Sequence, residues 1–181
     1  MKIPVEIQKV KDPDGVERFR LTMSLHDALM NTSLNKQIIY TQEKYKKSVN
    51  ICKDIIDNIR KSRRNAGDSV LKWYLSDVIY SFLKGMEEDG LVLVNFAKSF
   101  SRDLGVSVSQ INYMIEFRTT YPEIEMINNK ISWDKYKEIL DVSDRSVRKM
   151  ITEKLISREL KTREDIRKLK KEIKFRSRLP Y

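Results

Sequence analysis

Gly105 is followed by small polar and regularly spaced apolar side chains, a pattern that could present hydrogen-bonding groups to a nucleic acid. Glycine adopts a positive φ at low cost, so Gly105 could end one helix in a tight turn. Ser107 or Ser109 could then cap a second helix by accepting hydrogen bonds from its free N–H groups. Ile111 and Met114, three positions apart, would face back onto the first helix. The stretch therefore predicts a helix-turn-helix.

The first helix of this pair is expected over residues 91–104 and the second over residues 107–121. Polar side chains on the outer face of a second helix can hydrogen-bond base edges in the major groove of a DNA duplex. The candidate base-contacting residues are Ser107, Ser109, Gln110, Asn112 and Tyr113. A plain helical hairpin with a glycine cap would show the same local pattern. The distribution of charge is therefore needed to choose between a DNA-binding helix-turn-helix and such a hairpin.

Positive charge is both abundant and clustered. The formal charge of +10 and the pI near 9.6 favour a polyanionic partner. Residues 145–178 hold 14 Lys and Arg against 5 Asp and Glu, and residues 44–64 hold 8 against 2. Such clusters suit a protein that holds phosphates with cations and contacts bases with polar groups. The candidate phosphate-binding cations are Lys98, Arg102, Arg118, Arg145, Arg148, Lys149, Lys168 and Lys171.

Residues that commonly support catalysis are scarce. His26 is the only histidine and Cys52 the only cysteine, so neither a zinc site nor a nucleophile–histidine pair is expected. Walker and dinucleotide-binding glycine motifs are missing as well. We therefore expect no enzyme activity, no cofactor and no metal site.

Composition predicts a folded and mainly α-helical protein. Hydrophobic residues make up 40% of the 181 residues, while five Gly and four Pro are too few for a turn-rich β architecture. No apolar run is long enough to span a bilayer, and the N-terminus lacks the apolar core of a signal peptide. A single cysteine fits a reducing compartment, so we expect a cytoplasmic protein with no membrane contact.

Hydrophobic periodicity indicates the elements that would position these residues. Residues 3–23 alternate around an Asp12-Pro-Asp-Gly15 turn and predict a β-hairpin. Further helices are expected over residues 25–30, 35–63, 69–86, 133–140, 144–156 and 162–174. Polar residues 62–68 suggest a boundary between an N-terminal hairpin-and-long-helix module, 1–64, and a helix-turn-helix domain, 65–181.

The helix over residues 35–63 carries an apolar stripe with a spacing of three and four. The stripe consists of Ile38, Tyr45, Val49, Cys52, Ile56 and Ile59. It could be the seam of a homodimer, or it could pack on the protein's own core, because both produce this spacing. Cys52 lies on the stripe, so it is expected to be a small buried hydrophobe.

A series of short motifs follows one another between residues 73 and 173. They are Gly90, Ser101-Arg-Asp-Leu104, Ser109, Tyr113-Met114, Phe117, Tyr121-Pro122, Ile131-Ser-Trp133, Tyr136, Leu140 and Arg148. In this order they resemble the N-terminal helical domain of YhcG-type proteins, which precedes a separate nuclease domain. Residues 130–137 and the helix start at 162–166 resemble, more loosely, the helix-turn-helix domain of ParB-type partition proteins. The nuclease module and the nucleotide-binding box of those families have no counterpart here, so the resemblance implies nucleic-acid binding without catalysis.

Together these observations predict a protein that binds double-stranded DNA, in transcriptional regulation or in a partition or mobile-element role. A protein–protein adaptor for a separate nuclease or mobile-element complex is the main alternative, with the long-helix stripe as its interface. RNA binding is a third alternative, because Tyr113 and Trp133 could stack on bases. Trp133 begins an amphipathic helix, however, and is expected to lie in the core.

Overall fold

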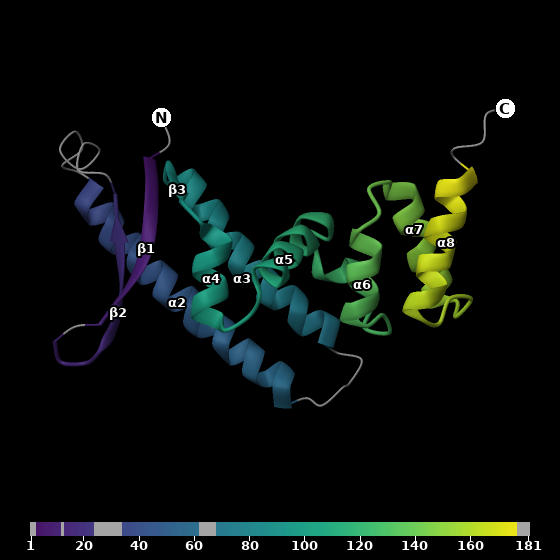
Figure 1. Ribbon diagram of the computed structural model, residues 1–181, viewed down its shortest axis with the longest axis horizontal. Coiled ribbons are helices and arrows are strands. Elements are labelled where there is room, and N and C mark those ends of the chain that lie inside the picture. Colours follow the sequence, from purple (N-terminus) through teal and green to yellow (C-terminus); the bar gives the residue numbers. More distant parts are fainter. Residues whose placement is uncertain (1–2, 12, 24–33, 62–67, 177–181) are drawn as a thin grey trace.

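The computed structural model describes residues 3–11, 13–23, 34–61 and 68–176. Within them the chain is mainly α-helical with a small sheet near the N-terminus, as predicted (Figure 1). The elements in chain order are β1 (Ile3–Lys11), β2 (Glu17–Thr22), α2 (Leu34–Lys61), α3 (Asp68–Glu88), β3 (Leu91–Leu93), α4 (Phe96–Leu104), α5 (Val108–Thr120), the 3-10 helix η1 (Ile124–Met126), α6 (Trp133–Leu140), α7 (Arg145–Ile156) and α8 (Arg163–Arg176). The predicted helix over 25–30, with His26, lies outside the described residues.

The predicted β-hairpin is confirmed. β1 and β2 pair antiparallel, with Lys11 opposite Glu17, and Gly15 in the connecting turn has a φ of +81°. Alternate side chains face the core, so Val5, Ile7 and Leu21 are buried. An isolated hairpin is only marginally stable in water, and here its apolar face is covered by the hydrophobic core.

The predicted helix over 91–104 is wrong in its first third. Leu91–Leu93 forms β3, which pairs parallel with β1 and gives the strand order β2-β1-β3. Leu91 and Leu93 are buried while Val92 is exposed, which is the alternation of a strand with one covered face. The partner strand lies almost ninety residues earlier in the chain, and local periodicity carries no information about such pairing.

The apolar stripe of α2 packs inside the chain. Tyr45, Val49, Cys52 and Ile56 are all buried in the core. The Tyr45 ring packs edge-on against Phe100 at 5.0 Å between ring centroids. The stripe is therefore occupied within one copy, and a homodimer through this helix would need its other face. Burial also raises the pKa of the Cys52 thiol to about 12, as expected for a structural cysteine.

The buried residues form two hydrophobic clusters that meet at α5. The first combines the sheet with α2, α3, α4 and the start of α5, including Ile111 and Met114. The second combines the end of α5, from Phe117, with α6, α7, α8 and Trp73 of α3. The core thus divides within α5, whereas the boundary expected from polar composition lies between α2 and α3, which pack on each other.

Polar side chains cap the starts of the last two helices, α7 and α8, close to the predicted starts at residues 144 and 162. The Asp144 carboxylate accepts hydrogen bonds from the backbone N–H groups of Ser146 at 2.7 Å and Val147 at 3.3 Å. Thr162 and Asp165 each accept a hydrogen bond from the other's backbone N–H. Both arrangements satisfy N–H groups that a helix start leaves unpaired.

Candidate nucleic-acid interface

α4 and α5 are joined by the tight turn that the sequence predicts. Gly105 has a φ of +65°, and its N–H donates to the Ser101 carbonyl. The Ser107 hydroxyl accepts from the Gln110 N–H at 3.2 Å, and the Gln110 side-chain oxygen accepts from the Ser107 N–H at 3.0 Å. Ser107 and Gln110 are therefore engaged with each other in a capping box, which fixes the start of α5.

Ser109 and Asn112 lie on the outer face of α5, as predicted. Ile111 and Met114 are buried on its inner face, so the alternation of the two faces follows the helical period. The side chains of Ser109 and Asn112 are exposed, and neither side chain forms a hydrogen bond with another residue in the described part of the chain. Of the candidate base-contacting residues, these two have side chains that are available to a ligand.

Carboxylates lie near the middle of the same helix, at Glu116 of α5 and at Asp141, the partner of Tyr113. The Tyr113 hydroxyl donates to Asp141 at 3.1 Å, and this hydrogen bond raises the pKa of the tyrosine. Partial burial raises the pKa of Glu116, as does the charge of Asp141, while Arg148 lowers it. The outer face of α5 is therefore neutral over its N-terminal half and carries a carboxylate beyond it, at Glu116, four residues after Asn112.

Arg118 is held by α3 instead of facing solvent. Its Nε donates to Asp77 at 2.6 Å, and its guanidinium lies over the rings of Trp73 at 5.1 Å and Tyr80 at 5.4 Å. Only 19% of the side chain is exposed. Arg118 therefore fastens α5 to α3, and the phosphate contact predicted for it does not fit this position.

The two candidate cations of α4 differ in their surroundings. Arg102 donates two hydrogen bonds to the buried Asp103 carboxylate, at 2.7 and 3.0 Å, and the same carboxylate accepts from Tyr45 at 2.7 Å. The charge of Arg102 is thus largely balanced by its neighbour. Lys98 is exposed, and the described residues offer it no ion-pair partner.

An open cleft of about 720 Å³ brings α7 cations next to the end of α5. Arg145, Arg148 and Lys149 line it from α7, because their spacing of three and four places them on one face. The opposite wall is formed by the end of α5 and the segment after it: Thr119, Thr120, Tyr121, Pro122 and Met126. The structure thus joins candidate cations of α7 to the helix that carries Ser109 and Asn112.

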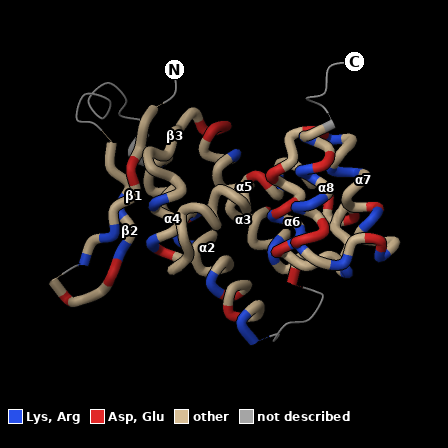
Figure 2. Tube along the Cα trace, turned by 45° about the vertical axis from the view of Figure 1, so that its right-hand side comes forward, with Lys and Arg blue, Asp and Glu red and all other residues tan. Residues whose placement is uncertain are grey.

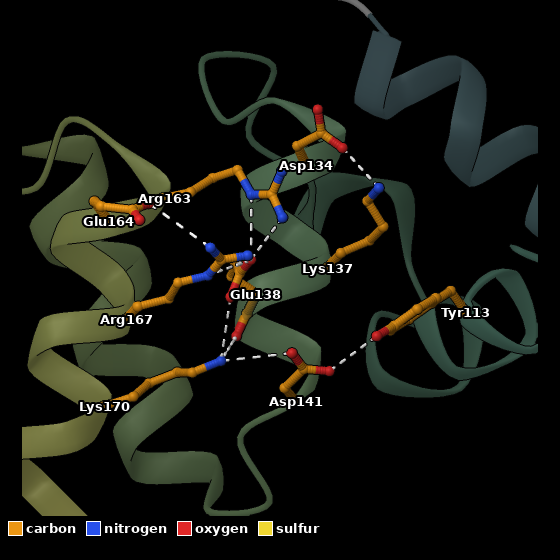
Figure 3. A network of polar contacts seen from close by, with 9 residues as sticks. All are labelled: Tyr113, Asp134, Lys137, Glu138, Asp141, Arg163, Glu164, Arg167 and Lys170. Carbon is orange, nitrogen blue, oxygen red and sulfur yellow. Dashed lines mark hydrogen bonds and ion pairs between the residues drawn. The ribbon is translucent and has the colours of Figure 1, made fainter. Parts of the chain in front are cut away.

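The basic segment of α8 is partly neutralised inside the protein. Figure 3 shows Arg163, Arg167 and Lys170 converging on Glu138 of α6, at 2.8, 2.6 and 3.4 Å. Burial by itself raises the pKa of Glu138, but hydrogen bonds from the two arginines and the lysine charge outweigh it and lower the pKa to about 2. These three cations fasten α8 to α6 and are not free to hold a ligand.

Lys168 and Lys171 are the α8 candidates that remain exposed, and neither is paired with another described residue. Figure 2 shows Lys and Arg spread over α7 and α8 among acidic positions. The candidate cations therefore fall into an available group, Lys98, Arg145, Arg148, Lys149, Lys168 and Lys171, and an internally engaged pair, Arg102 and Arg118.

Comparisons with known proteins returned no match to this chain, from family models, from curated proteins or from solved structures. The resemblance to the YhcG-type and ParB-type helical domains therefore stays a prediction. In the described ranges, no cluster of three or more His, Cys, Asp or Glu side chains could hold a metal ion. Across the same ranges, no helix is both long enough and apolar enough to cross a bilayer.

Proposed function

We propose that this protein binds double-stranded DNA, with the N-terminal half of α5 in the major groove. The observation that carries the proposal is the pair of exposed and unbonded side chains, Ser109 and Asn112, on a helix whose start is fixed by a glycine turn and a capping box. A rigid helix end with polar side chains is what base-edge hydrogen bonding requires. A cytoplasmic location fits this role and the single buried cysteine.

Phosphate contacts are assigned to the cations that have no internal partner. Arg145, Arg148 and Lys149 are the strongest candidates, because they line the cleft beside the end of α5. Lys98, Lys168 and Lys171 extend the available charge. Arg102 and Arg118 leave the set, since Asp103 and Asp77 balance their charges.

The salt dependence of duplex affinity tests the electrostatic part of this assignment. If about five phosphates are engaged, log affinity is expected to fall against log salt concentration with a slope of roughly −4 to −5. The measurement is fluorescence anisotropy of labelled duplexes at several salt concentrations. A slope near zero, or retention on structured RNA that duplex DNA does not compete away, would contradict duplex binding.

Asn112→Ala tests the recognition helix. On a duplex selected from a random pool, the variant is expected to bind more weakly by roughly 1–3 kcal/mol, because a side-chain contact to a base edge is lost. On random DNA its affinity should stay close to that of the unchanged protein.

The matched control is Asn58→Ala, an exposed asparagine of α2 far along the chain from α5. It should leave both affinities unchanged. Equal losses on selected and random duplexes for Asn112→Ala would remove this residue from base recognition.

A further inference from the structure

The cleft between α5 and α7 places the α7 cations, which are also candidates for duplex phosphate contacts, beside apolar surface that duplex binding by α5 does not use. Its α7 wall presents three cationic side chains within one helical turn, Arg145, Arg148 and Lys149. Among the described residues that line the cleft, Glu153 is the one acidic residue. The wall is therefore strongly positive over a short distance, which favours a compact anion.

Side chains, and not the end of the helix, supply this positive charge. The first N–H groups of α7 already donate to the Asp144 carboxylate, at Ser146 and Val147. An anion in the cleft would therefore be held by the guanidinium groups of Arg145 and Arg148 and by the Lys149 ammonium group. Guanidinium groups bind phosphate oxygens in pairs, and an ammonium group adds a point charge.

The wall opposite these cations is partly apolar. Met126 is 42% exposed and Pro122 is exposed beside it, so both offer apolar surface to whatever enters. A simple inorganic anion would gain nothing from that surface. A sugar or base attached to a phosphate would bury it.

Tyr121, which lines the cleft, has a buried hydroxyl. Tyr121 is only 8% exposed, and its hydroxyl makes no hydrogen bond of good geometry with the described residues. Burial raises the pKa of the Tyr121 hydroxyl, while the neighbouring Thr152 hydroxyl lowers it. Thr152 donates its own proton to the Arg148 carbonyl at 2.9 Å. A buried hydroxyl with unused hydrogen-bonding capacity therefore lies at a residue that lines the cleft.

We infer that the α5–α7 cleft binds one nucleotide, with its phosphate on Arg145, Arg148 and Lys149 and its sugar or base against Pro122 and Met126. A volume of about 720 Å³ is ample for such a unit, and the cleft is open to solvent. The inference rests on the proposed function in one respect: if the nucleotide belongs to a DNA strand, that strand continues from the duplex held by α5. A free mononucleotide has the same chemistry.

The experiment titrates the full chain with dTMP, thymidine, inorganic phosphate and a 5′-phosphorylated tetrathymidylate, followed by amide chemical shifts in NMR spectra. We expect saturable dTMP binding with a Kd of about 1 mM or tighter, and thymidine binding at least roughly tenfold weaker. Arg145→Ala with Lys149→Ala should weaken dTMP binding at least about tenfold. Met126→Ala should weaken dTMP binding and leave inorganic phosphate binding unchanged.

The control is Lys47→Ala with Lys53→Ala, which removes the same charge from exposed positions of α2. Equal weakening by this control, no saturation with any phosphate compound, or phosphate binding as tight as dTMP binding would overturn the inference. If the tetranucleotide binds more tightly than dTMP, the natural ligand is a nucleotide within a strand. If the two bind equally, the natural ligand is a free nucleotide.

The two proposals fail separately in these measurements. Asn112→Ala should weaken duplex binding and leave dTMP binding unchanged, since Asn112 does not line the cleft. Met126→Ala should weaken dTMP binding and leave the affinity for a blunt-ended duplex unchanged. Duplex binding without dTMP or tetranucleotide binding would therefore leave the proposed function in place and remove the nucleotide site.

Discussion

Replacing Phe117 with alanine is expected to lower the free energy of unfolding by about 3–5 kcal/mol. The Phe117 side chain is fully buried where α5 enters the second hydrophobic cluster. Its ring packs edge-on against Trp133 at 5.0 Å, Tyr136 at 5.1 Å and Tyr121 at 5.2 Å between centroids. Alanine would leave a cavity among three aromatic rings, none of which can move far enough to fill it. Urea denaturation followed by circular dichroism measures the loss.

The control for this change is Phe175→Ala, at a position of α8 that is 66% exposed. This substitution deletes the same ring atoms from a solvent-exposed position, so the free energy of unfolding is expected to fall by less than about 0.5 kcal/mol. Hydrogen exchange should show faster opening of α6, α7 and α8 in the Phe117 variant, because these helices share its cluster. Losses of similar size in the two variants would contradict the role of Phe117.

Glu138→Gln is expected to cost about 3 kcal/mol of stability at pH 7, the free energy that corresponds to lowering a carboxyl pKa from 4.5 to about 2. Glutamine keeps the size of the side chain but removes the buried negative charge on which Arg163, Arg167 and Lys170 converge. The matched control is Glu164→Gln, because Glu164 is 69% exposed and lies 3.8 Å from Arg167. An exposed pair of this kind contributes at most about 1 kcal/mol.

The contribution of Glu138 should disappear in acid. Its pKa is lower in the folded protein than in the unfolded chain, so the unfolded chain takes up a proton first as the pH falls. The stabilisation is therefore complete above about pH 5 and is lost as the pH falls from there towards 2. The difference in unfolding free energy between the unchanged protein and Glu138→Gln should shrink over that range. A difference that stays constant from pH 7 to pH 3 would contradict this origin.

Net charge alone gives an incomplete view of how this protein could meet a polyanion. The formal charge of +10 counts Arg118, Arg163 and Arg167 equally with Lys149. In the folded chain the first three are engaged by Asp77 or Glu138, while Lys149 lines an open cleft. Fewer cations can therefore release counterions than the sequence suggests, which is why the expected salt slope is modest.

Features set by neighbours along the chain could be predicted from the sequence. The turn at Gly105, the capping pair Thr162 and Asp165, and the hairpin around Gly15 each depend on residues a few positions apart. The outward position of Ser109 and Asn112 follows from the helical period for the same reason. Local backbone preference and periodicity are sufficient for such features.

Contacts between residues far apart in the sequence were decided by the tertiary structure alone. It paired Leu91–Leu93 with β1, set Arg118 on Asp77 across 41 positions, and placed Glu138 against cations 25 to 32 positions later. It also brought the end of α5 beside α7 to form the cleft. Within one basic segment of the sequence, some cations therefore form ion pairs inside the protein and others stay available to a ligand. Which cations are paired depends on the carboxylates that the packing of the helices brings close to them. That division depends on packing between distant elements, about which the spacing of charges along the chain carries no information.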